Sequence, residues 1–181
     1  MTWVIIIGFL VIVFLGLRGT KKAQGIEKAF INDLRGIGID YSQKIDVGSY
    51  VGGHPDIDDV IHMVFCFKRD DKLTFYAKRY KKTSSIGSVY YDHIGDVPIG
   101  KIKDIIIEDA STIERKVTLG RAMLVGVFAL AWKKRKKNDE TYLNIEWNDG
   151  KFNHETLFHF ENNGAFNNAN KARNALIKLI R

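Results

Sequence analysis

The side chains best suited to chemistry lie close together in residues 54–62. Two imidazoles and three carboxylates occur within these nine residues, namely His54, Asp56, Asp58, Asp59 and His62. Imidazole and carboxylate groups both bind divalent metals. If His54, Asp58 and His62 converged on one ion, the chain would be a metal-dependent enzyme, which is one alternative function.

The spacing of this cluster does not favour a metal site. His54 and His62 would share a face of a helix only if residues 54–62 were helical, and Pro55 lies within that stretch. The spacing also matches none of the metal motifs that have a defined mechanism. We therefore predict a polar loop that leads into a strand, with no metal bound.

Other catalytic arrangements are not evident in the sequence. No Ser or Cys stands in a nucleophile-elbow context, and no glycine-rich phosphate loop joins a strand to a helix. Cys66 lies in the apolar run VFCF, whereas a reactive cysteine needs an electropositive and partly exposed setting. The sequence predicts no enzyme, no catalytic residue and no cofactor.

Two basic runs are the next candidates for a binding surface. The first consists of Lys133, Lys134, Arg135, Lys136 and Lys137, and the second is KRYKK at residues 78–82. Residues 133–137 form a solvated loop, a contact for anionic lipid or a contact for nucleic acid. No aromatic residue interrupts this run to stack on bases, so we expect lipid and no nucleic acid. A nucleic-acid-binding protein is the second alternative function.

The first residues predict a membrane anchor. Residues 3–17, WVIIIGFLVIVFLGL, carry no charge, and together with Met1 and Thr2 they would span about 25 Å as a helix. We predict a transmembrane helix in residues 1–19, with Trp3, Ile5, Phe9, Ile12, Phe14 and Leu17 in the membrane. A cleaved signal peptide and a buried core helix are the alternatives. No Lys or Arg precedes the run, which weakens the signal-peptide interpretation.

The charges beside the anchor predict its orientation. Arg18, Lys21 and Lys22 follow the apolar run, so the positive-inside rule places the rest of the chain in the cytoplasm. The net charge is +7, but without these three residues and the run at 133–137 the chain is close to neutral. The basic excess therefore indicates anionic inner-leaflet lipids before it indicates DNA. We expect a single-pass protein of the cell membrane.

Length and composition limit the remaining possibilities. The chain has 181 residues, of which 45% are hydrophobic, and a single cysteine. This excludes a disordered chain and an intramolecular disulfide framework, and it allows one domain with an appendage. A second apolar run, residues 122–132, is too short to span a bilayer. It is either a core segment or a segment that dips into the membrane interface.

The elements that must position these residues follow from hydrophobic periodicity. Ile26, Phe30 and Leu34 predict a helix in residues 22–35 within a juxtamembrane linker, 20–42. We expect strands at 61–67, 73–77, 88–93, 102–109, 112–117, 143–147 and 156–160, with turns at 69–72 and 148–150. A closing amphipathic helix, 164–181, would place Phe166, Ala169, Arg173, Leu176 and Ile180 on one face, with Asn162 or Asn163 as its N-cap.

Four stretches resemble a known family. They are residues 52–55 (GGHP), 105–112 (IIIEDAST), 117–132 (VTLGRAMLVGVFALAW) and 142–147 (YLNIEW). They resemble small bacterial membrane-associated proteins of the Gram-positive type that carry a pleckstrin-homology-like domain. The resemblance covers roughly residues 45–180. It implies a mainly β (α+β) domain, a seven-stranded bent barrel capped by a C-terminal helix, in residues 43–181, but no functional residues.

One departure from the lipid-binding pleckstrin-homology pattern bears on function. Where those domains place Lys and Arg around the first hairpin, this chain has the acidic loop 54–59 (HPDIDD). Phosphate oxygens would meet carboxylates there, so we expect no headgroup pocket at this loop. The sequence as a whole predicts a membrane-anchored, non-catalytic scaffolding module. Its basic loops would face lipid, another surface would recruit an unknown protein, and homo-oligomerisation stays open.

Overall fold

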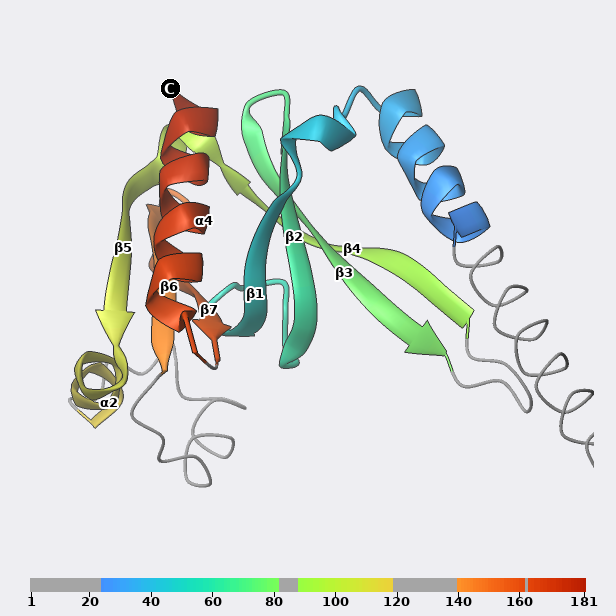
Figure 1. Cartoon of the computed structure of the whole chain (residues 1–181). Coiled ribbons are helices and arrows are strands. Elements are labelled where there is room, and N and C mark those ends of the chain that lie inside the picture. The colour runs from blue at the N-terminus through green and yellow to red at the C-terminus, as the bar shows by residue number, and fades with distance from the viewer. Residues whose placement is uncertain (1–23, 82–87, 119–139, 162) are drawn as a thin grey trace, which may run out of the picture.

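A computed structural model describes residues 24–81, 88–118, 140–161 and 163–181. Seven strands form one antiparallel sheet with the order β4-β3-β2-β1-β7-β6-β5 (Figure 1). The strands are β1 (Ile45–Gly52), β2 (Ile61–Arg69), β3 (Lys72–Lys81), β4 (Ser88–Pro98), β5 (Ile102–Asp109), β6 (Thr141–Asn148) and β7 (Asn153–Phe160). The predicted mainly β fold with seven strands and a C-terminal helix is confirmed.

The described part of the chain also contains helices. They are α2 (Ala110–Thr118), α4 (Ala165–Ile180) and a helix at residues 24–36, together with the 3-10 turns η1 (Tyr41–Gln43) and η2 (Ile99–Lys101). The two predicted turns are confirmed: Asp70, with a φ of 52°, lies between β2 and β3, and Gly150, with a φ of 108°, lies between β6 and β7. Within the described ranges, no helix is both long and apolar enough to span a bilayer.

The main core lies between the inner face of the sheet and α4. Val47, Phe75, Leu143 and Phe158 are fully buried there, and Leu176 of α4 packs among them. Alternation along each strand sends every second side chain to this face. Cys66 belongs to the same core, and burial raises the pKa of its thiol.

The buried face of α4 differs from the predicted one. Its buried residues are Ala165, Ala169, Ala172 and Leu176, a spacing of three or four that follows one helical stripe. The predicted Phe166 is 59% exposed, because it lies one residue, about 100°, away from that stripe. The N-cap is Gly164, with a φ of 94°, and not an asparagine.

The helix at residues 24–36 confirms the predicted stripe and packs on the opposite face of the sheet. Phe30 and Leu34 are buried against Phe65, Phe67 and Tyr76, which point outward from β2 and β3. Both faces of β2 are therefore covered, one by the core and the other by this helix (Figure 1). The helix thus forms part of the folded body.

The predicted strand at 112–117 is wrong, because these residues lie in α2. The Asp109 carboxylate accepts hydrogen bonds from the Thr112 backbone N–H at 2.7 Å and from the Ser111 hydroxyl at 2.8 Å. This N-cap begins a helix in spite of the β-branched residues that follow. Ile113 is then buried against Tyr142 and Leu157 on the outer face of β6 and β7. The seventh strand is instead β1, which the prediction did not single out.

Candidate functional site

The residues predicted to contact the membrane lie outside the part of the chain that the structure describes. This holds for Trp3, Ile5, Phe9, Ile12, Phe14 and Leu17, for Arg18, Lys21 and Lys22, and for Lys133, Lys134, Arg135, Lys136 and Lys137. The apolar run at 122–132 also lies outside it.

The histidines of the 54–62 cluster do not converge. His54 is only 4% exposed, and its Nε2 donates to the Asp96 backbone carbonyl at 3.0 Å. Its Nδ1 accepts from the Asp56 backbone N–H at 3.2 Å, which fixes the neutral tautomer. Burial lowers the pKa of His54, although the Asp96 carbonyl and the charge of Asp56 act in the opposite direction. His54 therefore ties the β1–β2 loop to β4.

His62 lies elsewhere, on the exposed side of β2. Its Nδ1 is 3.2 Å from the hydroxyl of Ser49 on β1. Among the described residues no group of three or more His, Cys, Asp or Glu side chains is placed to hold a metal ion. The proposed ligand set of His54, Asp58 and His62 is thus not assembled.

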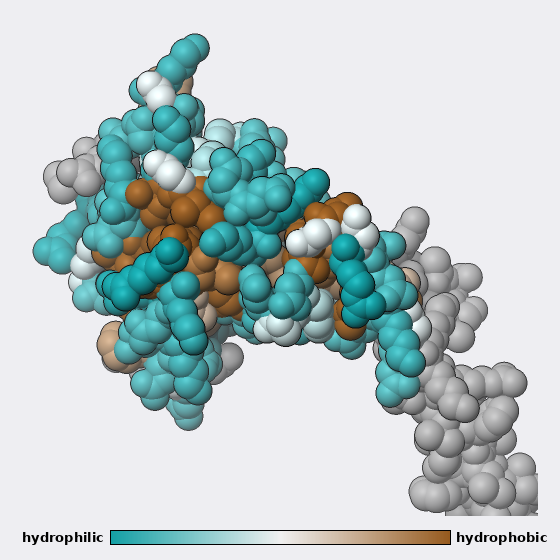
Figure 2. Space-filling view, turned by 90° about the horizontal axis from the view of Figure 1, so that it is seen from above, coloured by the Kyte–Doolittle hydropathy of each residue, from teal (hydrophilic) through white to brown (hydrophobic). Residues whose placement is uncertain are grey.

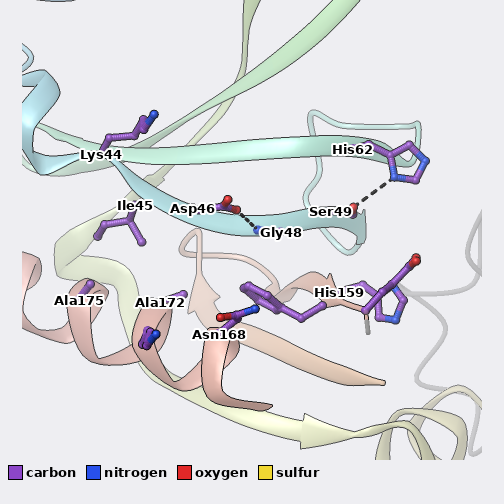
Figure 3. Close-up of a pocket in the computed structure, with 13 residues that line it drawn as sticks. Lys44, Ile45, Asp46, Gly48, Ser49, His62, His159, Asn168, Ala172 and Ala175 are labelled. Atoms are coloured by element: carbon purple, nitrogen blue, oxygen red, sulfur yellow. Dashed lines mark hydrogen bonds and ion pairs between the residues drawn. The ribbon is translucent and has the colours of Figure 1, made fainter. Parts of the chain in front are cut away.

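A groove lies between β1 and α4 (Figure 3). Its volume is about 670 Å³. One wall comes from β1 with the adjoining residues of β2, the other from α4, and the end of β7 closes it. The lining residues are Lys44, Ile45, Asp46, Gly48, Ser49, His62, His159, Phe160, Glu161, Asn168, Lys171, Ala172 and Ala175.

The groove exists because β1 separates from β7. The two strands pair at Ser49↔His159, Tyr50↔Phe158 and Gly52↔Leu157, but no described strand lies beside residues 45–47 on that side. On its other side β1 stays paired with β2 as far as Ile45↔Cys66. Residues 45–47 therefore form a short strand edge that faces α4 across the groove.

Gly48 and Asp46 form the point at which the strands separate. Gly48 has a φ of 82°, and a Cβ there would lie 2.5 Å from the carbonyl oxygen of His159, so only glycine fits. The Asp46 carboxylate accepts a hydrogen bond from the Gly48 backbone N–H at 2.9 Å. This bond satisfies a donor at the site where regular pairing stops.

The groove combines an apolar floor with a rim of both charges. Ala172 and Ala175 present small side chains from α4 opposite Ile45. Lys44 is held at one end, because its Nζ donates to the Tyr41 hydroxyl at 2.9 Å and lies 4.7 Å from the centre of the Phe65 ring. Lys171 is exposed on α4. Such a surface suits an extended peptide better than a small anion.

The groove also contains a serine–histidine pair, Ser49 and His62. A hydrolytic triad would need a carboxylate on the second nitrogen of the imidazole. Within the described residues, His62 is hydrogen-bonded to Ser49, and no carboxylate pairs with its ring. The arrangement supports hydrogen bonding to a ligand and gives no reason to assign a reaction.

A second, hydrophobic surface lies at the end of the molecule where α4 terminates. Figure 2 shows hydrophobic residues gathered on that face with hydrophilic residues around them. Partly buried hydrophobic residues there include Ile99 and Ile102 near the β4–β5 corner, and Ile177, Leu179 and Ile180 in α4. This face lacks the strand edge of the groove, so the groove is the stronger candidate.

The sequence analysis did not locate the groove or name the residues that line it. The local signal was Gly48 inside a strand pattern, which often marks a bulge. Comparison with protein-family models, with curated proteins and with solved structures gives no match for this chain.

Proposed function

We propose that this protein is a membrane-held, non-catalytic binding module whose β1–α4 groove captures an extended segment of a partner protein. The observation that carries this proposal is the strand edge at residues 45–47, which faces α4 and has no described strand beside it on that side. An extended peptide can pair with such an edge through its backbone. Its side chains would then alternate between the groove floor and the solvent.

The small residues of α4 favour this mode of binding. Ala172 and Ala175 leave room next to Ile45, so a small or apolar side chain of the peptide can enter between strand and helix. The rim carries both signs of charge, with Lys44 and Lys171 beside Asp46 and Glu161. Affinity would therefore come mainly from backbone pairing and apolar contact, and less from net charge.

The proposed fold is a pleckstrin-homology-like bent barrel with α4 as its cap. In support, consecutive strands pair as hairpins from β1 to β4 and from β5 to β7, and β1 joins β7. In further support, α4 contacts β1, β5, β6 and β7. A binding groove beside a terminal helix agrees with a scaffold whose activity is recognition, although fold alone does not define function.

The proposed membrane attachment uses the apolar residues 3–17 and the basic residues around them. The helix at 24–36 follows this segment directly and packs on the sheet, so anchor and domain would be joined by a short connection. The basic run 133–137 lies in the sequence between the end of α2 and the beginning of β6, and both of these are at the lower side of the body in Figure 1. That run would face anionic lipid.

The groove is tested by site-specific cross-linking of the full chain in its native membrane. A photoreactive residue at Lys171, on the groove wall, is compared with one at Asn174, which is exposed on α4 and does not line the groove. We expect an adduct from position 171 only. The substitution Ala175→Trp, which fills the groove, should abolish it, whereas Asn174→Trp should not.

A second measurement identifies the mode of binding. The cross-linked segment, made as a synthetic peptide, should slow hydrogen exchange of the backbone amides at residues 45–48 in the full chain. Equal adducts from positions 171 and 174, or an adduct that survives Ala175→Trp, would contradict groove binding. Protection confined to other strands would contradict strand addition.

A further inference from the structure

We propose that the β1–α4 groove binds the C-terminal end of a partner protein, with the terminal carboxylate held by Asn168 and Lys171. This inference rests on the proposed function and adds which part of a partner the groove would bind. Two observations carry it. The strand edge of the groove ends against β7, and the donors on the α4 wall are uncommitted while the acidic side chains of the groove are engaged.

The strand edge of the groove is short and closed at one end. Residues 45–47 have no described strand on the α4 side, which leaves an edge for about three residues of an added strand, or roughly 10 Å. At Gly48 the chain approaches β7 so closely that a Cβ would lie 2.5 Å from the His159 carbonyl oxygen, and pairing resumes at Ser49↔His159. A segment that continued along β1 would have to displace β7. A chain that ends at this point meets no such obstacle.

Asn168 and Lys171 offer the donors that a carboxylate needs. The two residues are three positions apart in α4, so their side chains project from the same face of the helix. Both are exposed and line the groove, and within the described residues neither side chain takes part in a hydrogen bond or an ion pair. Figure 3 shows Asn168 across the groove from Asp46 and Gly48, where the strand edge ends. An amide N–H and an ammonium group can both donate to one carboxylate.

The acidic side chains of the groove are already engaged. The Asp46 carboxylate accepts the hydrogen bond from the Gly48 backbone N–H at 2.9 Å. Glu161 Oε1 lies 3.3 Å from Nδ1 of His159. The uncommitted groups therefore favour a carboxylate over an ammonium group, and thus a C-terminus over an N-terminus.

The bound segment would run parallel to β1. It would enter beside Ile45 and Ala175, at the apolar end of the groove, and its carboxylate would lie opposite Gly48, next to Asn168. Backbone pairing and apolar contact would supply most of the affinity. The closed end would decide which part of a partner is bound, because a chain that continued further would be stopped by β7.

The test measures binding of synthetic peptides to the full chain in detergent. Three pools of N-acetylated octapeptides are made, random over the uncharged residues other than Cys and Pro. The first pool ends in a free carboxylate and the second in an amide. The third also ends in an amide but begins with Asp, so that its net charge equals that of the first. Retention of each pool by the immobilised chain is quantified by mass spectrometry.

We expect the carboxylate pool to be retained several-fold more than either amide pool, and Ala175→Trp to abolish this retention. Asn168→Asp should reduce retention of the carboxylate pool to that of the amide pools, because two carboxylates would then face each other. The matched control is Asn167→Asp, at an exposed neighbour on α4 that does not line the groove. It should leave retention of the carboxylate pool unchanged.

Equal retention of the carboxylate and amide pools, lost in Ala175→Trp, would overturn C-terminal recognition and leave groove binding standing. Retention of the Asp pool equal to that of the carboxylate pool would do the same, since the position of the carboxylate would not matter. An equal loss in Asn167→Asp and Asn168→Asp would show a general effect of charge and would also contradict the inference. Retention that is absent from the wild type, or that survives Ala175→Trp in all pools, would overturn the groove proposal together with it.

Discussion

The rings of Phe30 and Tyr91 lie parallel at 3.9 Å and join the helix at residues 24–36 to the outer face of the sheet. Phe30 is 7% exposed, and it also contacts Tyr41, Phe67 and Tyr76. The apolar contact between this helix and the sheet therefore depends mainly on Phe30 and Leu34. The segment that would connect a membrane anchor to the domain is thus part of the packed body.

Phe30→Ala should detach this helix while leaving the main core folded. Removing a buried phenylalanine costs about 3–5 kcal/mol, and here the loss falls on one helix. Hydrogen exchange of the full chain in detergent should show lost protection in residues 24–36 and retained protection in β6 and β7. The matched control, Phe166→Ala, removes a ring that is 59% exposed and should change stability by less than about 0.5 kcal/mol. Equal protection in both variants would contradict the docking.

His54 should make the stability of the fold depend on pH below neutrality. Its pKa in the folded state is lowered by burial, so the unfolded chain binds the proton more readily. The stabilisation is complete above the ordinary value of about 6.5 and is lost as the pH falls through the folded pKa, at up to about 1.4 kcal/mol per pH unit. His154 also disfavours the charged form of His54, whereas Asp56 and Asp96 favour it.

Urea unfolding of wild type and of His54→Gln at pH 7.5 and pH 5.0 checks this. The wild type should lose more free energy of unfolding between pH 7.5 and pH 5.0 than the variant does. Other titrating groups affect both chains alike, so the difference between the two losses is due to His54. If the free energy of unfolding fell by the same amount in both chains between these pH values, His54 would not contribute to the pH dependence.

The parts of the fold that could be predicted are those encoded by neighbouring residues. Strand β2 was recognised from its alternating pattern, although both of its faces are apolar because Val64 and Cys66 face the core while Phe65 and Phe67 face a helix. At 112–117 the β-branched residues Thr112, Ile113 and Val117 favoured a strand, but the Asp109 cap and the burial of Ile113 made a helix. Local propensity was overruled by capping and tertiary contact.

The groove could not be predicted, because it depends on contacts between distant segments. Gly48 and His159 are 111 positions apart in the sequence, yet their close approach determines where β1 leaves β7. The buried stripe of α4 begins at Ala165, whereas the predicted face began at Phe166. This difference of one residue in the rotation of the helix likewise decides which small residues line the groove. Periodicity identifies the helix but does not define its rotation to within one residue.

Gly48→Ala should be strongly destabilising, because two effects act together. The φ of 82° disfavours any side chain, and the added Cβ would lie 2.5 Å from the His159 carbonyl oxygen. We expect a loss of more than about 2 kcal/mol in urea unfolding. Gly150→Ala has a positive φ of 108° but open space, and should cost only about 1 kcal/mol. Gly100→Ala has open space and no positive φ, and should be close to neutral. Similar losses at positions 48 and 150 would show that the close approach is unimportant.

Lys116 holds α2 on the sheet through three glutamates. Its Nζ lies 2.6 Å from Glu108, 2.8 Å from Glu155 and 3.6 Å from Glu146. Burial acts to lower the pKa of Lys116, but the hydrogen bonds to Glu108 and Glu155 outweigh it and raise the pKa. Removing the lysine would leave carboxylates facing one another in a poorly hydrated site, with Glu108 only 7% exposed.

Lys116→Met should therefore cost about 2–4 kcal/mol, since an uncompensated buried charge is more costly than the loss of one ion pair. Hydrogen exchange should show the loss in α2 and in the neighbouring ends of β5 and β6. Adding Glu108→Gln to the Lys116→Met chain should restore part of the stability, because it removes one of the repelling charges. The control Lys101→Met, at an exposed lysine in η2, should have little effect. If Glu108→Gln and Lys116→Met were simply additive in their destabilisation, the carboxylates would not be coupled through Lys116.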